Sequence, residues 1–243
     1  VCLGSTIDLT ASADAPLPIV LASQNFENGL GSWTTTNNSG GSTPTIVGWE
    51  IKTNPFTSAN STPVTFNSGS GTSFLLSNPD LGGSGTSVNA LLTSPTFSTV
   101  GMSSMSLSLK HYYRLFTSGE ATIEVSTDGG TNWTVAKTYL ATAGTPAAFV
   151  TDNTNLDAFV GFANVQVRIS YIDGWSWYWA VDDISVTATP SSYAYSWTSS
   201  PSGFTSSVQN PTGVAPTVNT TYTVVATAAN GCSTPASTVE VVV

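Results

Sequence analysis

Charge is what this sequence has least of. Only 8% of its 243 residues are charged, with five Lys or Arg against fourteen Asp or Glu and a net charge of −9. Nucleic acids and anionic membranes bind proteins through clustered Lys and Arg, so this balance argues against both kinds of partner. The low charge does not indicate disorder, because 40% of the residues are hydrophobic.

Long apolar runs, histidine and cysteine are also scarce. No run approaches the ~20 residues of a membrane-spanning helix, so we expect no membrane insertion. One histidine and no cysteine cluster exclude the usual zinc sites. Cys2 and Cys232, in a Ser/Thr-rich and Lys-poor chain, indicate an extracellular, oxidising setting and one disulfide. Because the sequence begins with Val1, we expect a piece of a longer protein.

Strand and turn patterns fill most of the chain. The polar residues are largely Thr, which favours strands, and Gly, Asn and Ser, which favour turns. The clearest strand covers 105–115, where apolar residues alternate with Ser108, Lys110, Tyr112 and Arg114. Similar alternation recurs over 122–126 and 165–171, and no convincing helix is present. Regularly spaced strands with Gly and Asn turns predict an all-β sandwich or jelly-roll.

The two ends of the chain share one pattern. Ile7 and Leu9 alternate with polar residues, and strand patterns return from Tyr193 to Val243 with a hairpin signal at Asn230-Gly231. The motifs V-C-x-G-S-T-x-x-L-T-A, Y-x-W and P-x-x-x-x-T-Y-T-V-x-A-x-x-x-N-G-C resemble Ig-like repeats of large adhesins and gliding-motility proteins of type IX-secreting bacteria. In those repeats the motifs are continuous. The resemblance implies a discontinuous Ig-like domain, 1–15 plus 190–243, clamped by a Cys2–Cys232 disulfide across an insertion.

The inserted region, 16–189, carries its own ordered motifs. F-E-N-G-x-x-S-W, L-x-S-P, V-S-T-D-G-G-x-x-W and W-x-W-x-V-D-D-I-S-V follow one another along the chain. The set resembles the MAM-like jelly-rolls of secreted and surface-anchored bacterial proteins, without the cysteines of the animal domains. The expected fold is therefore a jelly-roll β-sandwich nested within an Ig-like β-sandwich. The aromatic stretch WSWYWAVDDISV, 175–186, would be its closing strand.

The same resemblance implies a structural calcium site. In such jelly-rolls the Glu of "FE" and an Asp of "DD" are calcium ligands, which here implicates Glu27 and Asp182, with Asp183 the less certain member of its pair. The first and last strands of a jelly-roll can pair and bring these acids together. Asp80 or Asn78 is a candidate third oxygen donor, because Ca²⁺ takes six to eight oxygens. The alternative is that Glu27 and Asp182 only accept structural hydrogen bonds.

Two sets of residues are candidates for ligand binding. Lys110, Tyr112 and Arg114 share the polar face of one strand, and Arg168 is expected nearby; together they suit sugar stacking or an acidic polysaccharide. The alternative is cross-strand pairing with Glu124. Trp175, Trp177 and Tyr178 are the second set: they are candidates for a sugar-stacking platform, and the alternative is that they fill the sandwich core.

Two further motifs are expected to be structural. His111 falls on the apolar face of its strand without a nucleophile elbow, so it is expected to be a core residue. Residues 126–133 resemble an Asp-box, a surface turn held by Asp128 with Trp133 packed beneath it.

These patterns favour a non-enzymatic module of a long extracellular adhesin at the cell surface. The expected partners are surface polysaccharide or glycoprotein and neighbouring Ig-like repeats of the same chain, with calcium stabilising the fold. The competing interpretation is an accessory carbohydrate-binding module of a secreted hydrolase or protease. A glycosidase needs only two carboxylates beside a cleft, yet no motif in the chain indicates one.

Overall fold

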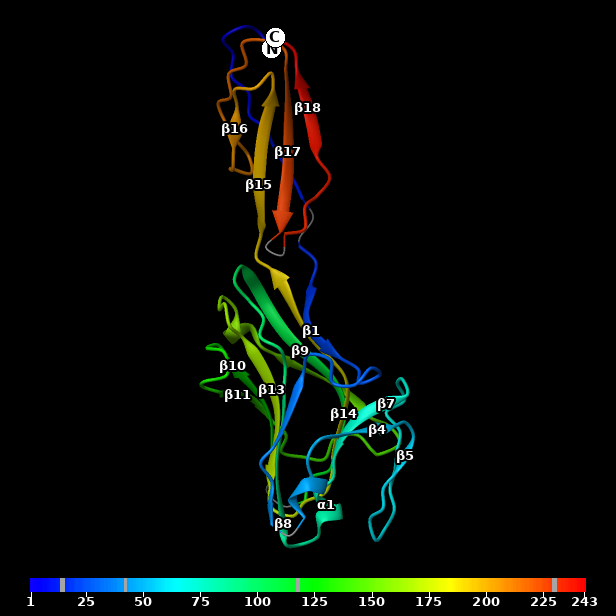
Figure 1. Cartoon of the computed structure of the whole chain (residues 1–243). Coiled ribbons are helices and arrows are strands. Elements are labelled where there is room, and N and C mark those ends of the chain that lie inside the picture. Colours follow the sequence, from blue (N-terminus) through cyan, green and yellow to red (C-terminus); the bar gives the residue numbers. More distant parts are fainter. Residues whose placement is uncertain (14–15, 42, 117–118, 229–230) are drawn as a thin grey trace. The chain divides into compact units, whose positions relative to one another are not determined.

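The computed structural model describes residues 1–13, 16–41, 43–116, 119–228 and 231–243. In that part the regular secondary structure is almost entirely β, with one short helix, α1 (Pro79–Gly82), and 3-10 turns at Pro44–Ile46 and Asp157–Phe159. None of the described helices is long and apolar enough to cross a membrane. The chain divides into two compact units (Figure 1). Unit 1 comprises Val1–Pro18, Gly101–Ser103 and Thr189–Val243, and unit 2 comprises Ile19–Val100 and Ser104–Ala188.

Unit 2 is a sandwich of two six-stranded sheets, so the expected all-β class and sandwich architecture are confirmed. The first sheet has the order β12-β9-β14-β7-β4, with β1 also beside β14. Its strands are β1 (Ile19–Gln24), β4 (Glu50–Thr53), β7 (Ser73–Ser77), β9 (Met102–Tyr113), β12 (Val150–Asn155) and β14 (Trp179–Pro190). The expected pairing of the first and last strands is confirmed, since β1 runs antiparallel to β14 from Ile19 opposite Ala188 to Gln24 opposite Ile184.

The second sheet of unit 2 has the order β11-β10-β13-β8-β2, with β3 beside β8. Its strands are β2 (Thr34–Asn37), β3 (Gly40–Gly41), β8 (Thr86–Thr93), β10 (Glu120–Ser126), β11 (Thr134–Thr138) and β13 (Gln166–Asp173). A separate hairpin joins β5 (Phe56–Thr57) to β6 (Thr65–Phe66).

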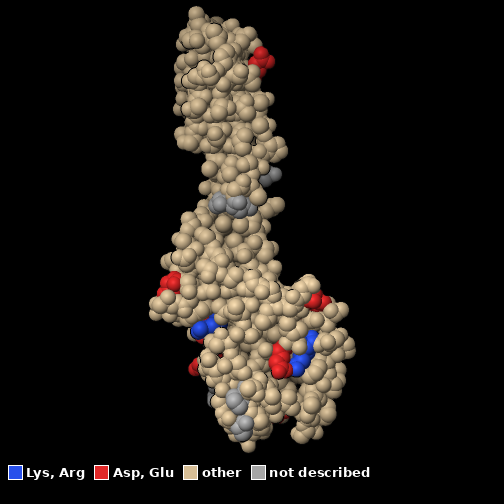
Figure 2. Space-filling model, in the orientation of Figure 1, with Lys and Arg blue, Asp and Glu red and all other residues tan. Residues whose placement is uncertain are grey.

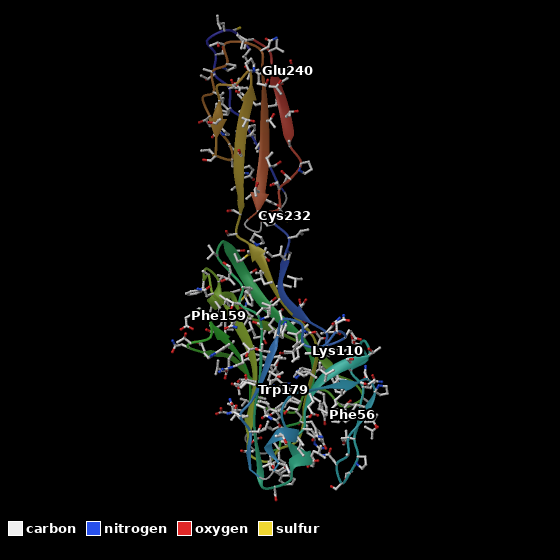
Figure 3. The ribbon with its side chains drawn as sticks, in the orientation of Figure 1. Phe56, Lys110, Phe159, Trp179, Cys232 and Glu240 are labelled. Carbon is white, nitrogen blue, oxygen red and sulfur yellow. The ribbon has the colours of Figure 1, made fainter. Side chains whose placement is uncertain are left out.

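The interior of unit 2 is organised around Trp179 on β14, labelled in Figure 3. Its fully buried ring lies 5.8 Å from the ring of Tyr171 on β13, so it joins the two sheets. His111 is only 1% exposed, and its Nδ1 accepts a hydrogen bond of 3.3 Å from Trp179 Nε1. The expectation that His111 is a core residue is therefore confirmed.

A second aromatic cluster covers the opposite face of the same sheet. Tyr178 directly precedes Trp179 and points the other way, because successive residues of an extended chain face opposite sides. Its ring meets Phe66 of the β5–β6 hairpin edge-on, with centroids 5.2 Å apart. The buried members of this cluster are Phe66, Phe74, Leu76, Tyr112, Phe149, Tyr178 and Ala180. The sheet that contains β14 is thus buried on both faces where Tyr112, Tyr178 and Ala180 lie.

The Asp-box turn between β10 and β11 is built around one carboxylate. Asp128 Oδ1 accepts hydrogen bonds from the Asn132 amide (2.9 Å) and the Ser126 hydroxyl (2.7 Å). Asp128 Oδ2 accepts another from Asn132 Nδ2 (2.7 Å), and Trp133 Nε1 donates to the Gly130 carbonyl. These bonds lower the pKa of Asp128 to about 2, and the bond from the Asn132 amide has the largest effect. The turn is the folding element that the motif predicts.

We expect Asp128→Ala to lower the melting temperature by a few degrees at pH 7. A lowered pKa means that the carboxylate contributes stability above its unfolded pKa near 4 and loses it as the pH falls towards 2. The gap between wild type and variant should therefore close over that range in thermal unfolding followed by circular dichroism. Glu120→Ala, at an exposed position on β10, is the control. A gap that persists unchanged at pH 2 would contradict the role of the charge.

Unit 1 is built on a four-stranded sheet with the order β16-β15-β17-β18. Its strands are β15 (Tyr193–Ser200), β16 (Thr205–Ser206), β17 (Thr220–Ala228) and β18 (Ser237–Val241). The N-terminal segment packs on this sheet through Leu9, which is buried against Trp197 and Tyr222. Instead of the predicted regular strand it forms a single bridge, Ile7 opposite Val214. The predicted boundary residue Ala15 and Asn230 of the predicted hairpin lie outside the described residues.

The predicted Cys2–Cys232 disulfide is wrong. Val1, next to Cys2, donates from its amino group to the Val242 carbonyl, close to where Thr220 begins β17. The Cys232 carbonyl accepts from the amide of Ala228, the last residue of β17. Nine extended residues separate these ends by roughly 27 Å, whereas a disulfide requires Cα atoms less than ~7 Å apart. Figures 1 and 3 show Cys232 at the end of β17 away from both termini.

Candidate functional site

Glu27 lies just beyond β1 and is held by the segment between β6 and β7. Its Oε1 accepts hydrogen bonds from the backbone amides of Thr72 (2.8 Å) and Ser73 (3.1 Å), and its Oε2 accepts one from the Thr72 hydroxyl. The bond from the Thr72 hydroxyl is the main cause of a lowered pKa for Glu27. Gly71 is required there, because a Cβ would lie 2.0 Å from Glu27 Oε1 and its φ is +51°. The ionised carboxylate is therefore cradled by one loop.

Asp182 is the buried member of the Asp182-Asp183 pair. Its side chain is 1% exposed, whereas Asp183 is exposed and has a φ of +44°. Oδ1 of Asp182 accepts the Asp183 amide at 2.8 Å, but Oδ2 has no hydrogen-bond partner. Burial raises the pKa of Asp182 to about 6, partly offset by the Ser68 hydroxyl and the Asp183 amide. This carboxylate lacks a full set of partners for its charged form.

The loop 67–72 reaches both carboxylates. Asn54 holds it in place by donating to Ser68 Oγ (3.0 Å) and the Ser70 carbonyl (2.9 Å) and by accepting the Ser68 amide (3.1 Å). The β1–β14 pairing ends at Gln24 opposite Ile184, three residues before Glu27 and two residues after Asp182. Carboxylate, hydroxyl and carbonyl oxygens are the donors that Ca²⁺ prefers, so these residues fit the ion by chemical type.

Asp80 and Asn78 belong to a different network. Asp80 Oδ2 accepts hydrogen bonds from Asn60 Nδ2 and from the Tyr178 hydroxyl (3.1 Å). Asn78 caps α1 by accepting the Leu81 amide, and its Nδ2 donates to Asn60 Oδ1 (2.9 Å). Among the described residues no three His, Cys, Asp or Glu side chains gather as a metal-binding group. Asp80 is therefore no third acidic ligand beside Glu27 and Asp182.

The predicted cationic face of β9 is divided in the structure. Tyr112, expected at the surface, is 4% exposed because the second aromatic cluster covers it, and Tyr178 is 1% exposed for the same reason. Arg168 lies in the other sheet, where its guanidinium pairs with Glu124 across the strands and stacks 4.0 Å from the Trp133 ring. The structural alternative of cross-strand pairing is thus correct for Arg168.

Two cations remain outside ion pairs within the described part of the chain. The ion pairs found there join Lys52 to Glu50, Lys137 to Asp152 and Arg168 to Glu124. Figure 2 shows this pattern on one face, where each Lys or Arg patch adjoins Asp or Glu atoms. Lys110 lies beside the loop 67–72, with its Nζ 3.8 Å from a Cβ built on Gly69. Arg114 follows β9 directly and takes part in the surface cluster described next.

Arg114, Phe116, Trp175 and Trp177 form an aromatic cap on unit 2. The Arg114 guanidinium lies 3.9 Å from the centre of the Trp177 ring. Phe116 meets Trp175 and Trp177 edge-on, at 5.4 and 5.9 Å between centroids. Phe116 is 41% exposed and both tryptophans are half-buried. The Arg114 amide fixes the arrangement by donating to the Tyr178 carbonyl at 2.9 Å.

Sequence reasoning named Arg114, Trp175 and Trp177 as candidate ligand-binding residues but missed Phe116. A signal was present, because 114/116 and 175/177 are both pairs spaced by two residues. Such pairs project to one side of an extended chain. The first pair follows the long strand β9, and the second pair precedes the long strand β14.

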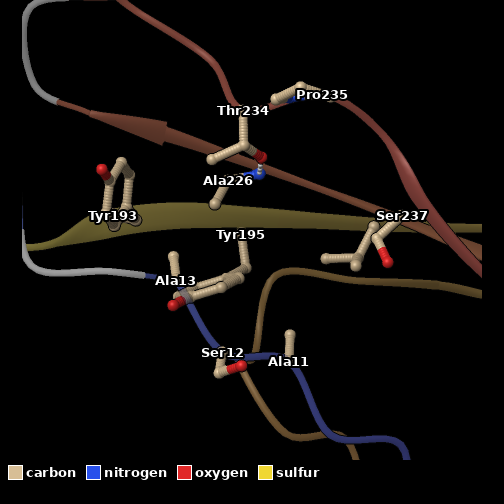
Figure 4. A pocket seen from close by; sticks show the side chains of 10 residues that line it. Ala11, Ser12, Ala13, Tyr193, Tyr195, Ala226, Thr234, Pro235 and Ser237 are labelled. Atoms are coloured by element: carbon tan, nitrogen blue, oxygen red, sulfur yellow. Dashed lines mark hydrogen bonds between the residues drawn. The ribbon is translucent and has the colours of Figure 1, made fainter.

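A separate pocket lies in unit 1, between the N-terminal segment and the sheet (Figure 4). Its volume is about 410 Å³ and no charged side chain lines it. The lining residues are Ala11, Ser12, Ala13, Tyr193, Tyr195, Val224, Ala226, Thr234, Pro235 and Ser237. Thr234 is held by a hydrogen bond from the Ala226 amide, and the Tyr195 ring lies along the N-terminal segment. None of these residues was a predicted site.

Comparison with known proteins finds similarity only at the level of structure. No protein-family model and no curated protein matches the chain. Two similar structures are the K1 and K3 cleaved adhesin domains of Lys-gingipain from Porphyromonas gingivalis W83. Their identities are 18% and 16%, with TM-scores of 0.45 and 0.49, over 70% of this chain and 97% and 98% of theirs.

A third similar structure is TmCBM61 in complex with β-1,4-galactotriose. It is 11% identical, with a TM-score of 0.38, over 67% of this chain and 92% of its own. Similarity at these levels assigns no ligand and no residue role to this chain.

Proposed function

We propose that the chain is a non-enzymatic, extracellular module of a surface adhesin and that the aromatic cap binds glycan. The observation that carries the proposal is a partly exposed cluster of three aromatic rings with the Arg114 guanidinium stacked on Trp177: Phe116 is exposed, and Trp175 and Trp177 are half-buried. Aromatic faces pack against the C–H faces of sugar rings, while a stacked guanidinium presents several N–H donors to sugar oxygens. A net charge of −9 favours a neutral glycan over a highly acidic one.

The proposal extends to the architecture of the chain. The Ig-like repeat expected over 1–15 plus 190–243 would correspond to unit 1 and adjoin further repeats. The MAM-like jelly-roll expected over 16–189 would correspond to unit 2. The second candidate is an accessory module of a secreted hydrolase or protease. The domains encoded beside this segment distinguish the two candidate functions. Tandem Ig-like repeats would support the adhesin module, and a flanking catalytic domain would support the accessory module.

We expect Trp177→Ala to weaken glycan binding at least tenfold, about 1.4 kcal/mol, because it removes the central ring of the cap. Arg114→Lys should weaken it less, since the charge remains but the planar stack is lost. The measurement is a glycan array of neutral oligosaccharides followed by calorimetric titration of the strongest hit.

Trp133→Ala is the matched control, because Trp133 also carries a stacked arginine, Arg168, at 4.0 Å. It should leave glycan affinity unchanged. An array without any signal for the wild type, or equal losses in Trp177→Ala and Trp133→Ala, would contradict the role of the cap.

We also propose that Ca²⁺ binds between Glu27 and Asp182 and stabilises the fold. The supporting observations are the unpartnered Asp182 Oδ2, the proximity of Ser68 and the Gly71 cradle around Glu27. Backbone carbonyls and water would supply the remaining oxygens. The role of the ion would be structural, because Asp182 is buried and Glu27 is bonded to the protein's own backbone.

A further inference from the structure

A layer of buried polar atoms lies beneath the aromatic cap. Of nine buried side-chain atoms without a hydrogen-bond partner in the described residues, five belong to this layer. They are the hydroxyls of Tyr113, Tyr171 and Ser176, Oδ2 of Asp173 and Nε1 of Trp175. Trp175 belongs to both features, because its ring is part of the cap while its N–H is buried.

Contacts join Tyr113, Tyr171, Asp173 and Ser176, and Trp175 lies between Asp173 and Ser176 in the sequence. The rings of Tyr113 and Tyr171 meet edge-on with centroids 6.0 Å apart, and both residues are fully buried. Burial, with a contribution from the Asp173 charge, raises the pKa of Tyr113 to about 12. The Ser176 hydroxyl lies close to the Tyr171 phenol: burial, the main cause, raises the pKa of Tyr171, while the hydrogen bonding of Ser176 acts to lower it.

Gly119 closes the layer on one side. A Cβ at that position would lie 2.0 Å from Asp173 Oδ2, so the Asp173 side chain would have to shift if Gly119 were replaced. On the other side Gly174 is exposed and open, between the partly exposed Asp173 and Trp175. Among the described residues, the cap and this turn lie between the polar layer and solvent on this side.

Leaving five polar groups unpaired is costly, and their chemistry restricts what can satisfy them. An indole N–H only donates hydrogen bonds and a carboxylate oxygen only accepts them, while hydroxyls do both. A bare cation satisfies the carboxylate but repels the indole N–H, and a bare anion has the reverse effect. A neutral O–H group donates and accepts at once and matches the whole set.

We propose that Tyr113, Tyr171, Asp173, Trp175 and Ser176 form a subsite that binds O–H groups. Two sources have this chemistry: ordered water in the free protein, and a hydroxyl of the glycan beside Trp175. The second source rests on the proposed function of the cap, whereas the first does not.

The test uses Tyr171→Phe and Tyr113→Phe, which keep the rings and remove one hydroxyl each. If water fills the subsite, each variant loses a hydrogen bond and its melting temperature falls by roughly 2–4 °C. If the hydroxyls are dry, removing an unpaired polar group leaves the melting temperature unchanged or raises it. Tyr139→Phe is the reference, because its hydroxyl donates to Asp152 Oδ2 at 2.7 Å.

The second arm measures the affinity of the same variants for the strongest oligosaccharide hit of the glycan array. A lower melting temperature with unchanged affinity identifies water as the ligand, and a loss of affinity of about fivefold or more identifies a sugar hydroxyl. If no glycan binds, the proposed function fails and the melting temperatures alone decide on the subsite. Variants that melt at or above the wild-type temperature and bind any glycan equally well would overturn the subsite.

Discussion

Removing calcium with EDTA should lower the melting temperature of the protein by roughly 5–10 °C. An ion present at a hundred times its dissociation constant stabilises the folded state by about 2.7 kcal/mol, and a domain of this size shifts by about 2–4 °C per kcal/mol. The physical reason lies in Asp182, whose Oδ2 is buried without a partner and whose pKa is raised to about 6. A divalent cation would stabilise the charged form that burial disfavours.

Asp182→Asn and Glu27→Gln should each abolish the response to EDTA in differential scanning calorimetry. Asp80→Asn is the matched control, since Asp80 bonds to Asn60 and Tyr178 and lies outside the proposed site. It should retain the full response even if it melts earlier. A wild-type melting temperature that is identical in EDTA and in calcium would contradict the site.

Lowering the pH from 7 to 4.5 should cost about 2–3 kcal/mol of stability through His111 alone. Burial is the main cause that lowers the pKa of His111 to about 4, with Asp152 opposing the shift and Lys137 adding to it. Between about pH 6.5 and pH 4 the unfolded chain binds a proton on this imidazole and the folded chain does not. Stability therefore falls as the pH falls through this window.

Urea unfolding of wild type and His111→Gln at several pH values measures this contribution. The glutamine retains an acceptor for the Trp179 Nε1–H group but does not titrate. The difference in unfolding free energy between the two proteins removes the effect of other titrating groups. As the pH falls, the unfolding free energy of the wild type should decrease more than that of His111→Gln. A difference between the two proteins that is constant from pH 7 to pH 4.5 would contradict a buried neutral imidazole.

Alternation along strands predicted much of the fold. It assigned His111 to the core with Leu109, and the Asp-box motif identified the turn around Asp128. It also assigned Tyr112 to the opposite face, which is correct, but alternation does not say what covers a face. The β5–β6 hairpin brings Phe66 over that side of the sheet, so Tyr112 is buried there.

The candidate site was predictable only in part, because several features depend on chain geometry. The choice between Asp182 and Asp183 depends on where β14 begins and on the positive φ of Asp183. The prediction of a disulfide was wrong because sequence motifs do not show that Cys2 and Cys232 lie towards opposite ends of β17. The cap and the polar layer depend on how the turns after β9 and before β14 meet. The alternation of apolar and polar residues does not predict the conformation of such loops.

The most direct test of the glycan-binding cap is a nuclear magnetic resonance titration that follows the indole N–H signals of the seven tryptophans. The strongest oligosaccharide hit is added to ¹⁵N-labelled protein, and each signal is assigned with single Trp→Phe variants. We predict that the signals of Trp175 and Trp177 shift with saturation while those of Trp133 and Trp197 stay in place. Shifts confined to Trp133, or to Trp197 in unit 1, with Trp175 and Trp177 unmoved, would contradict the account.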